Sequence, residues 1–225
     1  MKLLKLKFGR EYIVAMGDTI DCVPLINELQ KIHGKIILPV LYHNYNTIRS
    51  FFDNDKVELR CLSSFNDYEV WEKEFETISV IGELDMTLEF DLDMKSVYRA
   101  AGFNYDELIH TNVFAERFKK FPQVVVPGKP FAFIPEGGST KGFRIDRKYV
   151  GEDLEIIVPE HNVFMAAYAK TIYEAAEIHC HATGWQRLID KLPTKGKLFM
   201  HHYARPVPGV PAERFPFLKH WTQLK

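Results

Sequence analysis

Short apolar runs alternate with segments of helical periodicity along this chain, and this alternation constrains the fold more than any other feature. Strands separated by helices are joined by crossover connections and therefore lie parallel in one sheet. In the first half, the expected elements follow in the order strand 11–16, helix 19–33, strand 35–42, helix 46–54, strand 56–62, helix 65–75 and strand 77–82. This half is predicted to be a parallel α/β domain.

The helix expected at 19–33 shows the periodicity clearly. Its apolar residues recur at helical spacing and are Ile20, Val23, Ile26, Leu29 and Ile32. Gly34 follows directly and is the predicted C-cap, because glycine tolerates the left-handed conformation that ends many helices.

The alternation restarts after a stretch with the composition of a linker. Residues 94–120 are expected to be helical with a break at Gly102, and residues 121–130 hold three prolines and one glycine. We therefore predict an N-terminal Rossmann-like domain of residues 1–120 and a C-terminal one of residues 121–225. In the second half, the expected order is strand 131–136, polar loop 137–149, strand 154–160, helix 162–175, strand 177–182, helix 183–192, strand 196–204 and helix 212–221.

The composition is that of a globular protein without membrane or nucleic-acid character. The chain has 225 residues, of which 46% are hydrophobic and 26% charged, and its net charge of −1 gives no global attraction to nucleic acid or anionic lipid. The cysteines Cys22, Cys61 and Cys180 form no CxxC pair, which argues against a disulfide framework. Without a signal-like run or an apolar stretch of about 18 residues, we expect a cytoplasmic protein with no membrane span. The sequence does not define an oligomeric state.

The turns after the strands are the expected functional positions, because ligands of parallel sheets bind outside the carboxyl ends of the strands. In two tandem domains these ends are expected to border a cleft. The first turn holds Gly17, which allows close approach of a ligand, and Asp18 near the start of the helix. A carboxylate there either caps the helix or points into the cleft as a general base.

The spacing of Gly17-Asp18, Pro24-Leu25 and Leu29 resembles the opening of heptosyltransferase-type glycosyltransferases. Those enzymes have the GT-B fold, in which two Rossmann-like domains face a cleft that holds a nucleotide-sugar donor. The resemblance implies a GT-B fold of two small α/β domains, with Gly17 near the donor. It also implies that Asp18 is the base that deprotonates the acceptor hydroxyl.

The second turn contains Tyr42, His43 and Asn44 at the end of the strand 35–42. The Tyr-His-Asn sequence resembles that of bacterial and viral glycosyltransferase-like proteins that begin with a Gly-Asp-x-Ile turn. On the functional reading, His43 or Asn44 contacts the acceptor or the sugar. On the alternative reading, these residues form a helix N-cap with a surface histidine.

The polar loop 137–149 carries the groups that a diphosphate needs: flexible backbone N–H groups, hydroxyls and cations. Its candidate ligands for the donor are Ser139, Lys141, Arg144 and Arg147, which follow Gly137 and Gly138. The loop has no GxxxxGK[ST] sequence and is therefore not a Walker A loop. Its placement is similar to that of the loop in fucosyltransferase-like GT-B enzymes whose arginine binds the donor's phosphates. The alternative is a solvated basic loop with Asp146 and Glu152 as local partners.

The histidines and cysteine of the strand 177–182 first suggest a metal site. In a strand, His179 and His181 point to one face and Cys180 to the other, so the three cannot bind one metal. His201 and His202 lie on a later strand and also face opposite ways. A metal would need further ligands, and we predict no metal site.

The turn after this strand is the more informative part. Thr183 is expected to cap the next helix, whose N-terminal N–H groups then form an anion site. Residues 182–185 resemble the strand–turn–helix of fucosyltransferase-like GT-B enzymes, in which a small or hydroxyl pair and an aromatic residue follow the strand. The resemblance implies donor contacts from Thr183 and Gly184, and it leaves Trp185 as either a core residue or a base-stacking surface.

Glu160 ends another strand and either reaches the nucleotide or caps the next helix. Together these features predict a metal-independent, inverting glycosyltransferase that needs no cofactor. It would move a hexosyl- or deoxyhexosyl-type sugar from a nucleotide-diphosphate donor to a glycan or other hydroxyl acceptor. The alternatives are a non-catalytic nucleotide- or sugar-binding module of the same fold and a His/Cys metal protein.

Overall fold

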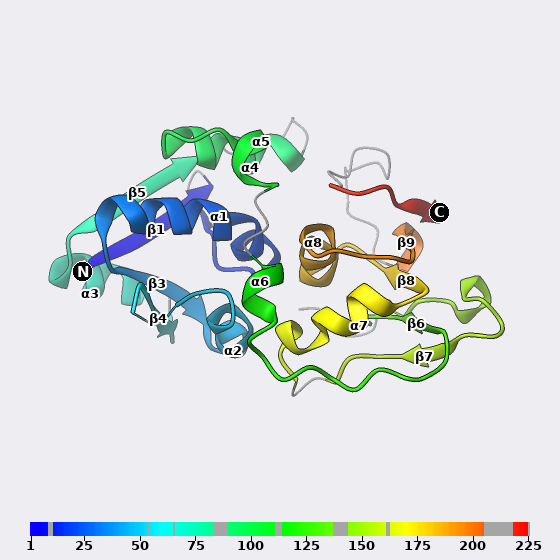
Figure 1. Ribbon diagram of the computed structural model, residues 1–225. Coiled ribbons are helices and arrows are strands. Elements are labelled where there is room, and N and C mark those ends of the chain that lie inside the picture. The colour runs from blue at the N-terminus through cyan, green and yellow to red at the C-terminus, as the bar shows by residue number, and fades with distance from the viewer. Residues whose placement is uncertain are drawn as a thin grey trace. The chain divides into compact units, whose positions relative to one another are not determined.

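The computed structural model contains two parallel β-sheets with interleaved helices, and the predicted α/β fold class is confirmed (Figure 1). The contacts between residues divide the chain into two compact units, residues 1–111 and residues 112–225. The sequence-based boundary after residue 120 lies shortly beyond this division. The structure describes residues 1–8, 11–53, 55–64, 66–82, 90–110, 114–136, 144–160, 163–204 and 218–224.

The first unit has four parallel strands in the order β4-β3-β1-β5, and a short fifth strand pairs antiparallel with β1. The strands are β1 (Lys2–Phe8), β2 (Glu11–Tyr12), β3 (Ile36–Leu41), β4 (Val57–Leu62) and β5 (Thr77–Gly82). The chain runs from β1 outward through β3 to β4 and then crosses to β5 on the other side of β1. The direction of winding therefore reverses beside β1.

The prediction of a first strand at 11–16 is correct only for Glu11 and Tyr12, which form the short second strand β2. The central strand is β1, which comes from the lysine–leucine stretch at the N-terminus, and the chain then turns back at β2. Leu3, Leu4 and Leu6 are buried, and the ammonium group of Lys5 pairs with Glu72 on a covering helix. The lysines alternate with buried leucines, so this central strand resembles an exposed, charged segment in the sequence.

Helices cover the sheet of the first unit on both faces. They are α1 (Met16–His33), α2 (Tyr45–Arg49), α3 (Asn66–Glu74), α4 (Phe90–Ala100) and α5 (Tyr105–Leu108). α1 and α4 contact each other, and α4 packs on β1 and β5. On the opposite face, Tyr68 of α3 packs against Leu3 and Ile37. The predicted C-cap Gly34 and the predicted break at Gly102 are confirmed, with φ of 75° and 82°.

Within its described residues, the second unit has five parallel strands in the order β10-β9-β8-β6-β7. They are β6 (Phe131–Phe133), β7 (Glu155–Ile157), β8 (Glu177–Cys180), β9 (Lys197–His201) and β10 (Thr222–Leu224). The winding reverses between β6 and β8, because the chain passes from β6 to β7 on one side and returns to β8 on the other. This reversal is the topological switch point of the sheet.

The helix expected at 183–192 is found within one residue at each end, whereas the helix expected at 162–175 is shorter than the sequence predicts. The described helical elements of the second unit are α6 (Ala115–Phe118), α7 (Ala169–Glu174), α8 (Gly184–Lys191) and the 3-10 turns η2 (Arg147–Tyr149), η3 (Met165–Tyr168) and η4 (His202–Ala204). The helix expected at 162–175 is a 3-10 turn followed by the short α7, and its proposed cap Asn162 lies outside the described residues. Most of the closing helix expected at 212–221 also lies outside them, and the sequence did not predict β10. Among the described helices, none has the length and apolar character that crossing a bilayer requires.

Candidate functional site

In the second unit, the turns that follow β6 and β8 flank the switch point of the sheet. Ligands of open parallel sheets bind at such a point, outside the carboxyl ends of the strands. The turn after β8 holds Thr183, Gly184 and Trp185, and the segment after β6 leads into the basic loop. The topology thus brings the carboxyl ends of β6 and β8 together, since these strands are direct neighbours.

Thr183 is the N-cap residue of α8, as predicted, but its side chain does not cap the helix. The Thr183 hydroxyl donates to the carbonyl oxygen of His181 at 3.3 Å. The buried thiol of Cys180 contacts the same hydroxyl at 3.9 Å, and burial raises the pKa of this thiol to about 12. The N-terminal end of α8 therefore carries its partial positive charge without a bond from the N-cap side chain.

Trp185 lies half-buried in an aromatic cluster at the end of β6. Its ring packs edge-on against Phe133 and Tyr168, with centroid distances of 5.5 and 5.7 Å. The hydroxyl oxygen of Tyr168 accepts the backbone N–H of Glu160 at 2.8 Å, and the Glu160 side chain is exposed. The sequence reasoning missed Tyr168, which fixes the chain beyond β7.

Glu136, which directly precedes the basic loop after β6, binds the last part of that loop and is a residue that the sequence reasoning also missed. One oxygen of the Glu136 carboxylate accepts the backbone N–H of Ile145 at 2.7 Å, and the other pairs with Arg147 at 2.8 Å. The position of an acidic residue directly before a glycine-rich basic loop could have indicated this interaction. Of the predicted donor residues, Arg144 is exposed, and Ser139 and Lys141 lie outside the described residues.

In the first unit, Gly17 and Asp18 belong to the first turn of α1. The N-cap is Ala15, whose carbonyl oxygen accepts the Thr19 hydroxyl at 2.9 Å. Asp18 is half-buried and is the third residue of the helix, where a carboxylate interacts favourably with the helix dipole. Asp18 is thus not the N-cap, and Gly17 has an ordinary helical position rather than a left-handed one.

Asn44 joins the turn after β3 to the start of α1. Its buried side-chain amide donates to the carbonyl oxygen of Val14 at 3.3 Å. The preceding residues point outward: His43 is exposed, and the Tyr42 side chain is 82% exposed. The structure therefore brings the second predicted turn next to the first, with Asn44 as a buried brace and His43 at the surface.

Two of the histidines that suggested a metal site, His179 and His201, bind each other, and His179 also binds a carboxylate. His179 Nδ1 lies 2.9 Å from His201 Nε2, and His179 Nε2 lies 3.1 Å from the Glu177 carboxylate. Both nitrogens of His179 are thereby used in hydrogen bonds. Within the ranges that the structure describes, no group of three or more His, Cys, Asp or Glu side chains could hold a metal ion.

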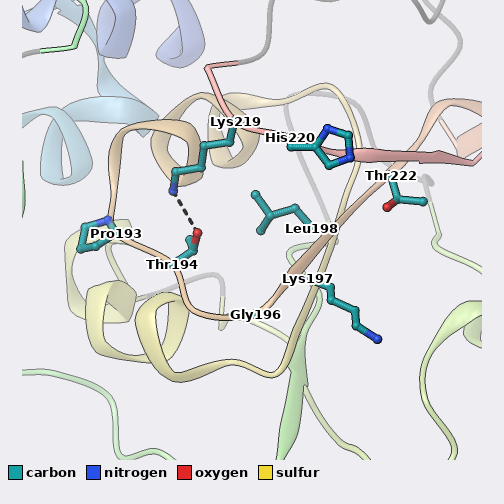
Figure 2. A pocket seen from close by; sticks show the side chains of 8 residues that line it. All are labelled: Pro193, Thr194, Gly196, Lys197, Leu198, Lys219, His220 and Thr222. Atoms are coloured by element: carbon teal, nitrogen blue, oxygen red, sulfur yellow. Dashed lines mark hydrogen bonds between the residues drawn. The ribbon is translucent and has the colours of Figure 1, made fainter.

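A hollow of about 630 Å³ lies at the amino ends of β9 and β10, away from the carboxyl ends where ligands bind (Figure 2). Figure 2 shows the Lys219 side chain reaching across it toward Thr194. The half-buried Lys219 ammonium donates to the Thr194 hydroxyl at 3.2 Å and to the carbonyl oxygens of Ile189 and Leu192. Burial lowers its pKa to about 8. Lys219 thus stabilises the C-terminal end of α8, and we assign this hollow no role in the site.

Two solved structures of the E. coli heptosyltransferase WaaC have a similar fold along the whole chain. One is described with ADP-2-deoxy-2-fluoro heptose and the other with ADP. Each alignment covers 100% of this chain, with 10% sequence identity and a TM-score of 0.55. The alignments cover 93% and 94% of the two WaaC chains. The chain has a fold of the GT-B type. These neighbours agree with the heptosyltransferase part of the resemblance and give no support to its fucosyltransferase part. The sequence matches no protein-family model and no curated protein.

Proposed function

We propose that this protein is a glycosyltransferase that moves a sugar from a nucleotide-diphosphate donor to a hydroxyl acceptor. The observation that carries the proposal is the fold shared along the whole chain with a heptosyltransferase described with ADP and an ADP-sugar. The placement of an uncapped helix N-terminus and a basic segment at the switch point of the second unit supports it.

The second unit binds the donor in this proposal. The N-terminal N–H groups of α8, at Thr183 and Gly184, donate hydrogen bonds to the diphosphate together with the exposed Arg144. Ser139 and Lys141 complete the same loop, and Arg147 contributes charge while it pairs with Glu136. Trp185 and Glu160 contact the nucleoside. Because the neighbours are described with ADP, an adenosine diphosphate sugar is the first donor to test.

The first unit binds the acceptor and supplies the base. The Asp18 carboxylate takes the proton of the acceptor hydroxyl, and the oxygen then attacks the anomeric carbon of the donor. The bond from that carbon to the diphosphate breaks in the same displacement, so the configuration inverts. The cationic side chains and the end of α8 stabilise the departing diphosphate, which makes a metal unnecessary. His43 contacts the acceptor from the neighbouring turn, with Asn44 as its buried support.

The first experiment is a thermal-shift panel of GDP, UDP, ADP and CDP and their sugars. A nucleotide at 100 times its dissociation constant stabilises the folded protein by about 2.7 kcal/mol, which gives a clear shift. No shift with any of them would remove the donor site from the proposal.

The second experiment compares Asp18→Asn with Asp55→Asn, an exposed aspartate of the same unit. Asp18→Asn is expected to slow sugar transfer by about 10²–10⁴-fold while nucleotide affinity stays unchanged, because a general base contributes that much. Asp55→Asn should behave as the wild type. Full activity of Asp18→Asn would contradict the base assignment. Nucleotide binding without any transfer in the wild type would favour the alternative, a non-catalytic nucleotide- or sugar-binding module.

A further inference from the structure

Four side chains of the second unit form a continuous hydrogen-bonded chain on one face of its sheet. His179 on β8 joins Glu177 at 3.1 Å and His201 on β9 at 2.9 Å, and His201 Nδ1 joins the Tyr203 hydroxyl at 2.8 Å. Both imidazoles have no exposed surface. The Phe199 ring stacks on His179 with a centroid distance of 4.6 Å. The two rings are therefore held in fixed orientations.

The chemistry of the two ends determines where the protons of this chain lie. A carboxylate only accepts, so the Nε2–H of a neutral His179 donates to Glu177, and Nδ1 of that ring is left as an acceptor. His201 then donates from Nε2 and accepts the Tyr203 hydroxyl proton at Nδ1. This arrangement requires both imidazoles to be neutral. Burial lowers the pKa of both rings, and that of His201 reaches about 4.

Both ends of this hydrogen-bonded chain also bind the backbone, at one position near the end of the basic loop and at one just beyond it. The Asp146 N–H donates to the Tyr203 hydroxyl oxygen at 3.0 Å. The Gly151 N–H donates to the Glu177 carboxylate at 3.1 Å. The four side chains thus connect two backbone positions on either side of η2.

Apolar packing supports the same segment between these two points. The Tyr149 ring of η2 lies 5.6 Å from the His201 ring and 5.8 Å from the Tyr203 ring, measured between centroids. Ile145 and Val150 are buried in the cluster that covers this face of the sheet. The segment is therefore held by two backbone hydrogen bonds to the chain, by ring contacts and by two buried aliphatic side chains.

We propose that Glu177, His179, His201 and Tyr203 are positioning residues that hold residues 144–151, and with them Arg144, beside the carboxyl end of β6. The inference rests on the proposed function, in which this segment borders the diphosphate of the donor. The four side chains act through the backbone of the segment rather than through contacts with the donor.

The test is Tyr203→Phe, which keeps the ring and removes the hydroxyl. We expect the Asp146 amide, followed by NMR, to exchange at least about tenfold faster, since its acceptor is lost. The affinity for ADP, measured by calorimetry, should fall by about tenfold, which corresponds to about 1.4 kcal/mol. The matched control is Tyr173→Phe on α7, because Tyr173 is 38% exposed and Tyr203 is 37% exposed. This control should change neither quantity.

A second pair of variants tests the Glu177 end of the hydrogen-bonded chain. Glu177→Ala should raise the exchange rate of the Gly151 amide, and Glu177→Gln, which keeps an accepting oxygen, should raise it less. Unchanged exchange in Tyr203→Phe overturns the inference, and so does faster exchange with unchanged ADP affinity. If the wild type binds neither ADP nor another nucleotide of the panel, the proposed function fails. Amide exchange alone then decides whether the chain holds the segment.

Discussion

Asn44 donates its side-chain amide hydrogen to the carbonyl oxygen of Val14 at 3.3 Å, from a position that is only 3% exposed. This bond ties the turn after β3 to the residues that lead into α1 and Asp18. The two turns that the sequence singled out in the first unit therefore form one structural unit, with a buried amide at its centre.

Replacing Asn44 with alanine should lower the free energy of unfolding by about 1–2 kcal/mol, because the buried Val14 carbonyl loses its donor. His43→Ala is the matched control, since His43 is the exposed neighbour, and its effect should stay within about 0.5 kcal/mol. Urea unfolding followed by circular dichroism measures both. Equal stability of the two variants would mean that the Asn44 bond contributes nothing.

The arrangement of strands and helices was predictable because it depends on local periodicity. The apolar runs of β3, β4 and β5 can each be recognised from a few consecutive residues, and the helical spacing of α1 from a few turns. β1 was not predicted in this way, because its lysines interrupt the apolar run although its leucines are buried. A central strand that carries three lysines, one of which pairs with a covering helix, cannot be distinguished from an exposed segment by composition.

The candidate site was predictable only in part, because its supports come from residues far apart in the sequence. Strand alternation separates His179 from Cys180, but it does not reveal that His201 forms a hydrogen bond with His179. That pairing depends on the register between β8 and β9, which places His179 beside Phe199. The hydrogen bonds from Ile145 to Glu136 and from Asp146 to Tyr203 likewise depend on the path of the polypeptide after β6.

Gly196 is a position where a side chain has no room. A Cβ atom there would lie well inside van der Waals contact with the carbonyl oxygens of Ala175 and Ala176, which are backbone atoms and cannot rotate away. Gly196→Ala should therefore destabilise the protein by about 1–3 kcal/mol, the usual effect of overpacking. In Gly128→Ala, the added Cβ meets no described atom within 4 Å, and the change should stay within about 1 kcal/mol. Thermal unfolding of the two variants distinguishes them, and similar midpoints would contradict the close contact.

The three cysteines should differ sharply in reactivity. Cys61 is exposed, whereas Cys22 and Cys180 are buried, and burial raises the pKa of Cys180 to about 12. Because the thiolate is the reacting form, a thiol reagent should modify one cysteine per native chain and three after unfolding. Cys61→Ser should abolish the native reaction. A second fast equivalent in the native protein would show that one of the buried thiols is accessible.

His201 should make the stability of the protein depend on pH between about 4 and 6.5. Burial and the neighbouring His179 lower its pKa from the usual 6.5 to about 4 in the folded state. Between these values the unfolded chain binds a proton that the folded chain does not, so the free energy of unfolding falls as the pH falls. The largest loss from this group is about 3 kcal/mol, at 1.36 kcal/mol per pH unit.

The measurement is a series of urea unfolding curves from pH 7 to pH 4 for the wild type and His201→Gln. The variant should be less stable at pH 7, where it lacks the hydrogen bonds to His179 and Tyr203, and it should lose less stability as the pH falls. His220→Gln replaces an exposed histidine of the same unit and should keep the wild-type dependence. Parallel curves for the wild type and His201→Gln would contradict a buried neutral imidazole at this position. Such curves would also contradict the proton positions assigned to the hydrogen-bonded chain from Glu177 to Tyr203.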